Sequence, residues 1–381
     1  MPRAVMYNKN TPVADIEIDN CEVKKIHDCM NVPYLPISLQ KEPTSPQTLT
    51  EWLEKRRIPK SREGLKQARE KFPGFEAYRH MFSLGDQYWF RYSTEETWES
   101  LNFFTNRYSE DVGRLFFTPW EVELDTAFTE TPDLMTNGAL RKRWKQDADG
   151  TSWLIKAGSR RLNQEPISEV LATMLLKRLD VIPFVEYELV VEGMRLCSKC
   201  KNFVTAETEF VPAIHVYQTK LRKKGETVYT HLLRMCDLYE VDGAKDFIDC
   251  MIAVDRILGN KDRHLGNFGF IRDVNTLKIL GFAPLFDSGY AFVQNQGEQR
   301  MPVFEEEEGL EALKGLLPHI NIDAFLDHKD MFSLIDVYPE ISSGEKQVIK
   351  EKILHAEKEV TGMTKKMVRG IGKKEKGREA R

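Results

Sequence analysis

The most informative part of this sequence is Gly259-Asn260-Lys261-Asp262-Arg263-His264-Leu265-Gly266-Asn267-Phe268-Gly269, together with the later stretch Leu285-Phe286-Asp287-Ser288-Gly289. An aspartate followed five residues later by an asparagine, with another aspartate in a Phe-Asp-x-Gly setting, is typical of phosphoryl-transferring enzymes. These enzymes use the three side chains as a catalytic base and two magnesium ligands. The two stretches therefore predict a phosphoryl-transfer site.

We predict a role for each polar residue of these stretches. Asp262 is the candidate general base, which accepts the proton of an attacking hydroxyl. Asn267 and Asp287 are the candidate metal ligands, because hard oxygen atoms suit Mg²⁺. Arg263 and His264 complete the candidate catalytic residues: either could orient Asp262 or bridge to Asp287, and His264 could instead lie in the core of the loop.

An upstream lysine supports the same interpretation. Lys156 lies in the apolar run Trp153–Gly158, which reads as a buried strand, where a charge is costly unless it has a partner. In kinases a strand lysine contacts the nucleotide phosphates and is held by a glutamate of the next helix. We select Glu169 over Glu165, which precedes a proline. A solvent-facing lysine at a strand edge remains the alternative.

The segment before Lys156 is the candidate phosphate-covering loop. Thr136–Trp144 contains one glycine, Gly138, and several basic residues, but it is not a G-x-G-x-x-G sequence. Gly138 is therefore a candidate nucleotide-binding residue, with a simple Asn-Gly hairpin turn as the competing interpretation. The sequence has no Walker A motif, which argues against a P-loop enzyme.

Composition limits the class of protein. A chain of 381 residues with 41% hydrophobic residues predicts two or more subdomains that share a cleft. Six scattered cysteines suit a reducing compartment, and Cys197 and Cys200 are expected in a turn between two strands. We expect a soluble, cytoplasmic protein, because no apolar run reaches the length of a membrane span.

Local patterns divide the chain into four parts. Residues 1–125 are aromatic-rich and form an N-terminal accessory region, and residues 126–212 read as strand, helix and strand, with an apolar helix expected over 168–179. Residues 213–362 are mostly helical, with an apolar helix over 244–258 that leads directly into the first stretch. Residues 363–381 are basic and predict a disordered tail.

The motifs resemble those of the HipA family of bacterial serine/threonine kinases, the toxin halves of toxin–antitoxin pairs. The resemblance is carried by Asn260-x-Asp262-Arg263-His264-x-x-Asn267, by Phe286-Asp287-x-Gly289, and by Lys156 with the helix of Glu169. It implies an α+β, two-lobed, protein-kinase-like fold with a small β-rich nucleotide-binding lobe and an α-rich C-terminal lobe.

The same resemblance implies the activity and its partners. It implies ATP with Mg²⁺ as cofactors, transfer of the γ-phosphoryl group to a serine or threonine hydroxyl of a protein, and autophosphorylation, for which Thr136 is the candidate hydroxyl. A separately encoded antitoxin or DNA-binding partner is expected, because the chain has no evident helix-turn-helix segment. Direct binding of this chain to nucleic acid or membrane is not expected.

Two other functions remain open from the sequence. Phosphatidylinositol kinases are similar in the Asp-Arg-His-x-x-Asn loop, so the phosphate acceptor could be a lipid or another small molecule. A catalytically silent nucleotide-binding regulator would use the same fold without turnover. The motif alone does not distinguish these acceptors.

Overall fold

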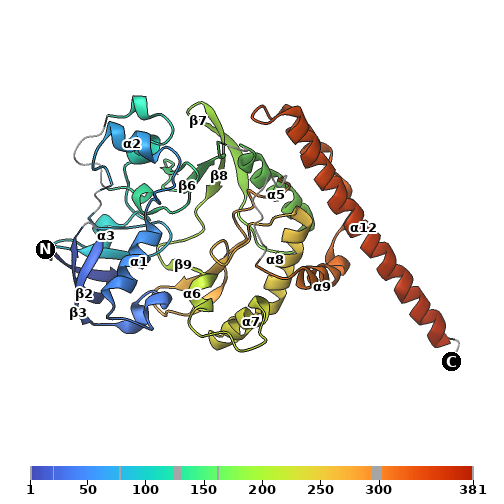
Figure 1. Ribbon diagram of the computed structural model, residues 1–381, viewed down its shortest axis with the longest axis horizontal. Coiled ribbons are helices and arrows are strands. Elements are labelled where there is room, and N and C mark those ends of the chain that lie inside the picture. The colour runs from blue at the N-terminus through green and yellow to red at the C-terminus, as the bar shows by residue number, and fades with distance from the viewer. Residues whose placement is uncertain are drawn as a thin grey trace.

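The structure is a computed structural model that describes residues 2–19, 21–76, 79–123, 130–160, 163–293 and 303–379, with side chains described as far as residue 367. The expected domain boundary at residues 125 and 126 lies outside the described residues. The fold is α+β, as predicted. Figure 1 shows a β-rich N-terminal half, a helical C-terminal half, and helix α12 along the outer edge of the helices.

The strands described here form three antiparallel sheets. The first has the order β3-β2-β1-β4, the second β5-β6-β8-β7 and the third β11-β10-β9. Their bounds are β1 Arg3–Asn8, β2 Thr11–Asp19, β3 Glu22–Cys29, β4 Tyr88–Arg91, β5 Lys142–Gln146, β6 Ser152–Ala157, β7 Tyr187–Glu192, β8 Arg195–Lys201, β9 Thr208–Pro212, β10 Gly269–Asp273 and β11 Ile279–Phe282.

The helices are short in the N-terminal half and longer in the C-terminal half. Their bounds are α1 Pro46–Arg56, α2 Leu65–Lys71, α3 Trp98–Leu101, α4 Asp111–Arg114, α5 Glu165–Leu179, α6 Ala213–Tyr217, α7 Val228–Leu238, α8 Ala244–Leu258, α9 Glu306–Leu316, α10 Ile322–Leu326, α11 Lys329–Val337 and α12 Ser343–Glu379. Single 3₁₀ turns lie at Val32–Tyr34, Ile37–Leu39, Pro119–Glu121, Pro132–Met135 and Leu317–His319.

The two helices that frame the site match the sequence pattern closely. Helix α8 has the predicted bounds, with apolar side chains such as Ile248 and Met251 buried along one face. Helix α5 begins at Glu165 rather than at residue 168, because Pro166 is well tolerated in the first turn of a helix.

One hydrophobic core joins the accessory region to the second sheet. It contains aromatic residues such as Trp89, Phe103 and Phe116, and it continues into Ile155 of β6 and Cys197 of β8. The aromatic residues of the accessory region therefore pack a core. Cys197 and Cys200 both lie within β8, so the expectation that they form a turn is wrong; each is buried as a small apolar side chain.

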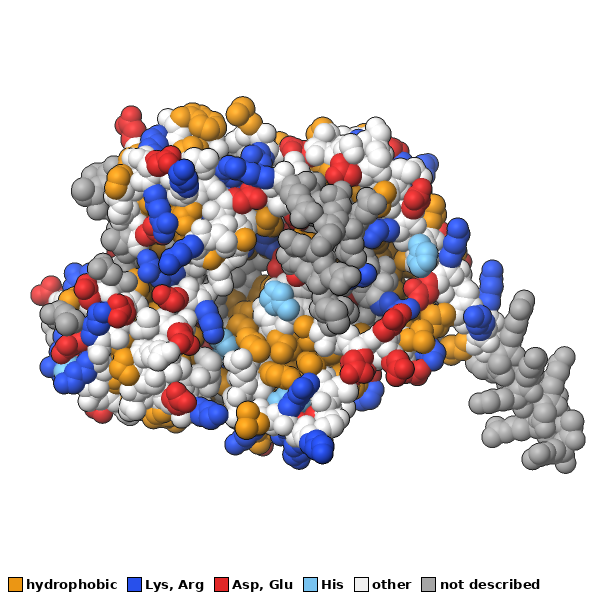
Figure 2. Space-filling view, in the orientation of Figure 1, with side chains coloured by type: hydrophobic (Ala, Val, Ile, Leu, Met, Phe, Trp, Pro, Cys, Tyr) orange, Lys and Arg blue, Asp and Glu red, His pale blue; other side chains and the backbone are white. Residues whose placement is uncertain are grey.

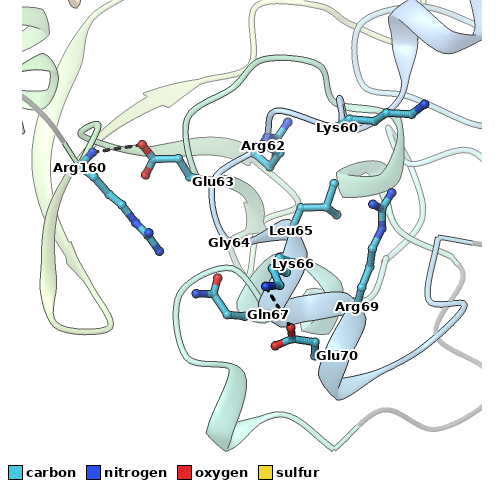
Figure 3. Close-up of a pocket in the computed structure, with 10 residues that line it drawn as sticks. All are labelled: Lys60, Arg62, Glu63, Gly64, Leu65, Lys66, Gln67, Arg69, Glu70 and Arg160. Atoms are coloured by element: carbon cyan, nitrogen blue, oxygen red, sulfur yellow. Dashed lines mark hydrogen bonds and ion pairs between the residues drawn. The ribbon is translucent and has the colours of Figure 1, made fainter.

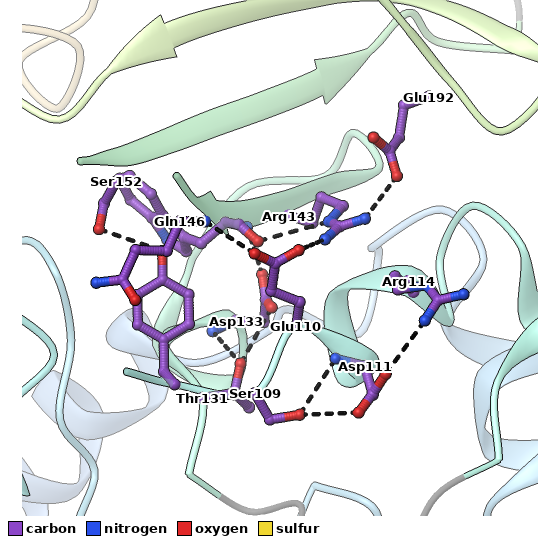
Figure 4. A network of polar contacts seen from close by, with 12 residues as sticks. Ser109, Glu110, Asp111, Arg114, Thr131, Asp133, Arg143, Gln146, Ser152 and Glu192 are labelled. Carbon is purple, nitrogen blue, oxygen red and sulfur yellow. Dashed lines mark hydrogen bonds and ion pairs between the residues drawn. The ribbon is translucent and has the colours of Figure 1, made fainter. Parts of the chain in front are cut away.

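A polar network also fixes strand β5 against the accessory region (Figure 4). Arg143 of β5 forms ion pairs with Glu110 and with Glu192 of β7, the second at 2.5 Å. The carboxylate of Asp133 accepts a 2.8 Å hydrogen bond from the backbone N–H of Trp144. Because Arg143 and Asp133 are buried, β5 and the loop before it have a fixed position.

A second core fills the C-terminal half and includes the inner face of α5, so that helix contacts both lobes. Helix α12 packs onto this core through Ile349, Ile353 and Val360. Its backbone remains helical to Glu379, through most of the range for which the composition predicts a disordered tail. Lysine, arginine and glutamate are strong helix formers, which accounts for this continuation. Within the described residues, no helix is long and apolar enough to cross a membrane.

Candidate active site

The catalytic loop begins where helix α8 ends, at Gly259, which adopts a left-handed conformation with φ 63°. Asp255, in the last turn of α8, accepts a 2.8 Å hydrogen bond from the side-chain amide of Asn260. The amide oxygen of Asn260 in turn accepts a 3.2 Å hydrogen bond from the backbone N–H of Asp262. The end of the helix therefore positions the candidate base.

Arg263 connects the two motif stretches. Its Nε donates to Asp255 at 2.8 Å, and its Nη1 donates to the carbonyl oxygens of Asn267 at 2.8 Å and Phe286 at 2.5 Å. Its Nη2 also lies 3.4 Å from the Ser288 hydroxyl. One buried guanidinium thus holds the residues on both sides of Asp287 beside the catalytic loop. We assign Arg263 as a positioning residue.

Asn267 is oriented by the candidate base itself. Its amide nitrogen donates a 3.1 Å hydrogen bond to the carbonyl oxygen of Asp262. This contact leaves the amide oxygen, the atom that can bind a metal ion, pointing away from that carbonyl. His264 is exposed, and its Nδ1 accepts a 3.0 Å hydrogen bond from the N–H of Gly266, so His264 is not part of the loop core.

Lys156 of β6 lies between two carboxylates. Its ammonium is 2.9 Å from Glu169 of α5 and 3.0 Å from Asp287. Lys156 and Glu169 are buried, whereas the side chain of Asp287 is 39% exposed. The alternative of a solvent-facing lysine is therefore wrong. Glu165 is also buried, but its carboxylate accepts from the backbone N–H of Ser159 at 3.1 Å.

Two polar side chains that the sequence did not identify complete this cluster. Ser198 of β8 donates a short hydrogen bond to the second oxygen of Glu169. The hydroxyl of Tyr187 in β7 lies 3.5 Å from the ammonium of Lys156 and accepts a 3.2 Å hydrogen bond from the N–H of Asp287. Within the described part of the chain, no buried side-chain nitrogen or oxygen of this cluster lacks a hydrogen-bond partner, so its geometry is fixed.

The ammonium and the carboxylates of this cluster stabilise each other's charged forms. Burial alone would lower the pKa of Lys156, but the carboxylates of Asp287 and Glu169 raise it well above its ordinary value. Burial would raise the pKa of Asp287, but the positive charges of Lys156 and Lys142 outweigh it and hold that pKa below its ordinary value. Asp287 is therefore an anion throughout the physiological pH range.

The candidate phosphate loop contacts a second lysine, Lys142. Lys142 of β5 is the direct cross-strand partner of Lys156. Gly138 has φ 107°, a conformation that other residues rarely adopt, and a Cβ atom there would lie 2.1 Å from the Nζ of Lys142, so a larger residue would be strained and would displace this ammonium. Burial, together with the positive charges of Arg62 and Lys156, lowers the pKa of Lys142 to about 7. Such a crowded cationic site suits an anionic ligand.

An arginine of the accessory region holds this loop in place. Arg62 is buried, and its Nε and Nη2 each donate a 2.5 Å hydrogen bond, to the carbonyl oxygens of Gly138 and Thr136 respectively. Glu63 adds a backbone hydrogen bond of 2.8 Å to the carbonyl of Ala139. The phosphate loop is therefore attached to residues about 75 positions earlier in the chain.

The donor set fits a magnesium ion that is bound together with a nucleotide. Asn267 and Asp287 supply hard oxygen atoms, and the backbone carbonyls next to them contact the same nitrogen of Arg263. Within the described ranges, no group of three or more His, Cys, Asp or Glu side chains could hold a metal. Mg²⁺ commonly takes only one or two carboxylates plus phosphate and water, so this sparse set suits it.

No protein-family model matches this chain. A 98-residue segment is 35% identical to the serine/threonine-protein kinase CtkA of Helicobacter pylori; the match covers 24% of this chain and 29% of that relative. The chain therefore aligns with less than a third of the length of CtkA.

Similar solved structures include the following two. A structure of the HipA, HipB and operator DNA complex of the Shewanella oneidensis MR-1 toxin–antitoxin system matches 94% of this chain and 96% of the compared chain, with TM-score 0.55 and 14% identity. The crystal structure of the Helicobacter pylori proinflammatory kinase CtkA matches 58% of this chain and 95% of that chain, with TM-score 0.44 and 20% identity. Over nearly its whole length, this chain therefore has the HipA-like kinase fold that its motifs predict.

Proposed function

We propose that this protein is an ATP- and Mg²⁺-dependent kinase that transfers the γ-phosphoryl group to a serine or threonine hydroxyl of a protein. One observation carries the proposal. The buried ammonium of Lys156 joins Glu169 and Asp287 at 2.9 and 3.0 Å, and Arg263 holds the Asp262–Asn267 loop against the residues that flank Asp287. These contacts support a site that combines a base, metal ligands and a phosphate-binding cation.

Each residue has a definite task in this proposal. Asp262 orients the acceptor hydroxyl and accepts its proton. Lys156 binds the phosphate oxygens that precede the transferred group, and Lys142 provides a second cation below Gly138. Asn267 and Asp287 would hold Mg²⁺, which neutralises charge on the phosphate groups when it is bound. Positioning and charge stabilisation supply most of the catalysis in this chemistry.

The protein acceptor is supported by the segment that is similar to the serine/threonine-protein kinase CtkA. Its test uses labelled ATP, Mg²⁺ and a cell extract, followed by separation of protein from lipid and by analysis of the labelled amino acids. We expect phosphoserine or phosphothreonine in the protein fraction. Label in lipid or in small molecules would instead identify the second type of acceptor, and no transfer under any metal condition would indicate a silent regulator.

We also propose a separately encoded antitoxin-type partner and a cytoplasmic location. The partner is supported by the fold shared with a structure of a HipA, HipB and operator DNA complex. The location is supported by the cysteines, since all six are free thiols. Co-purification of this chain with the product of a neighbouring gene tests the first proposal.

Autophosphorylation at Thr136 would require the phosphate loop to move. The hydroxyl of Thr136 donates to the carbonyl oxygen of Pro132 at 2.8 Å and accepts from the indole of Trp144 at 2.9 Å. Both contacts must break before this hydroxyl can reach a nucleotide bound over Lys156. Mass spectrometry after incubation with ATP tests whether Thr136 becomes phosphorylated.

A further inference from the structure

Two adjoining cavities lie beside the phosphate loop: Arg62, which holds that loop, lines one, and Arg141, which precedes Lys142, lines the other. The first has a volume of about 490 Å³ and is shown in Figure 3. It is lined by Lys60, Arg62, Glu63, Gly64, Leu65, Lys66, Gln67, Arg69, Glu70 and Arg160. The second has a volume of about 250 Å³ and shares Gln67 with the first. It is lined by Gln67, Leu115, Phe117, Pro119, Trp120, Arg141, Met194 and Arg195. We call the two cavities together the arginine groove.

Arg141 lies where the two cavities meet. It lines the second cavity, and a Cβ atom on Gly64 of the first cavity would lie 2.8 Å from its Nη1. Arg141 is only 9% exposed; its Nη1 donates to the carbonyl oxygen of Phe116, but its Nε has no hydrogen-bond partner in the described part of the chain. Arg141 therefore contributes positive charge at the junction of the two cavities, and this charge favours binding of an anion.

Two cations of the first cavity have acidic partners: Arg69 pairs with Glu76 and Lys66 with Glu70. Among the described residues, no carboxylate lies within ion-pair distance of the guanidinium groups of Arg141, Arg160 or Arg195. Burial lowers the pKa of Arg141, and the positive charges of Arg195 and Arg160 lower it further. One oxygen of Glu63 accepts from the backbone N–H of Arg160 at 3.1 Å, and the other is buried without a partner among the described residues. Glu63 and Glu70 are the carboxylates among the lining residues of the two cavities, so arginine and lysine outnumber them there.

The second cavity adds an apolar wall to these charges. Trp120 is 61% exposed and Met194 is 84% exposed, although large apolar side chains are usually buried. Tryptophan, methionine and arginine are enriched at protein–protein interfaces. Figure 2 shows several Lys and Arg side chains, with Asp and Glu side chains among them, over the upper part of the N-terminal half, around α2. A net charge of −4 and a single exposed aromatic side chain in the groove disfavour a nucleic-acid strand.

We propose that the arginine groove binds an acidic polypeptide segment, whose carboxylates contact Arg141, Arg160 and Arg195 and whose apolar side chain packs against Trp120 and Met194. The bound segment would lie directly behind the phosphate loop, because Arg141 immediately precedes Lys142. A partner in the groove can therefore influence the loop that covers the nucleotide without entering the active site.

The test is a binding measurement without nucleotide, so its outcome does not depend on kinase activity. A short fluorescein-labelled peptide of glutamate residues around one leucine is titrated with the full chain, and its anisotropy is recorded at low salt. We expect saturable binding that Arg160→Ala, Arg195→Ala and Trp120→Ala each weaken by about tenfold. These side chains are not fully buried, so the variants should keep the unfolding temperature of the wild type.

Arg222→Ala is the matched control, because Arg222 is an exposed cation between α6 and α7, on another part of the molecule. It should leave the affinity unchanged. The proposal would be overturned by no binding, or by equal weakening in Arg222→Ala. It would also be overturned if an oligothymidylate bound more tightly than the peptide with the same dependence on Arg160 and Arg195.

Discussion

Replacement of Arg263 by methionine should destabilise the protein and disorganise the site together. The substitution keeps much of the side-chain volume but removes the guanidinium that contacts Asp255 and the carbonyl oxygens of Asn267 and Phe286. Asp255 is only 7% exposed, so it would become a buried carboxylate whose remaining side-chain partner is the amide of Asn260. Removing one partner of a buried ion pair costs about 3–5 kcal/mol.

We therefore expect the free energy of unfolding of Arg263→Met, from urea titration followed by circular dichroism, to fall by about 3–5 kcal/mol. Addition of Asp255→Asn removes the stranded charge, so the double variant should lose less than the sum of the two single losses. Lys245→Met breaks an exposed pair with Asp249 and serves as the control, with a loss of about 0–1 kcal/mol. Equal losses for Arg263→Met and Lys245→Met would refute this reasoning.

Three further variants test the nucleotide site. Because burial lowers the pKa of Lys142 to about 7, the unfolded chain binds its proton more tightly, so stability should rise as the pH increases from about 7 toward 10.5. Lys142→Met should remove this part of the pH dependence, as measured by urea midpoints; an unchanged slope would contradict the assignment. Glu169→Gln removes one of the two carboxylates at Lys156 and should lower kcat/KM for ATP by about 10²-fold, whereas Glu188→Gln, in an exposed ion pair, should not. Gly138→Ala places a Cβ atom against Lys142 and should raise the Kd for ATP by about tenfold, measured by nucleotide titration; a Kd equal to that of the wild type would remove Gly138 from the site.

Local sequence patterns were sufficient to predict the helix and the strand that hold the site residues. The apolar period and terminal glycine of α8 gave its bounds, and the buried strand around Lys156 followed from its apolar run. Asp262, Asn267 and Asp287 could be selected because phosphoryl transfer constrains their order and spacing. Glu169 could be selected over Glu165 because it lies well inside the helix that follows the strand.

The supporting residues could not be found in the same way. Asp255 looks like one more polar residue of an amphipathic helix until its contact with Arg263 is known. Tyr187 and Ser198 lie on strands whose pairing brings them to Lys156 and Glu169, and Arg62 reaches the phosphate loop from the accessory region. These contacts depend on tertiary structure between segments far apart in the chain, and no local spacing encodes them.

The most direct measurement of the central claim is γ-phosphate transfer from labelled ATP with saturating Mg²⁺, compared between the wild type, Asp262→Asn and Asp287→Asn. Both variants remove a charge and keep the side-chain shape, so each should retain its fold. The account predicts transfer by the wild type, and a loss of at least about 10²-fold in both variants. Transfer by either variant at the rate of the wild type would show that the phosphoryl group moves at some other place on this protein.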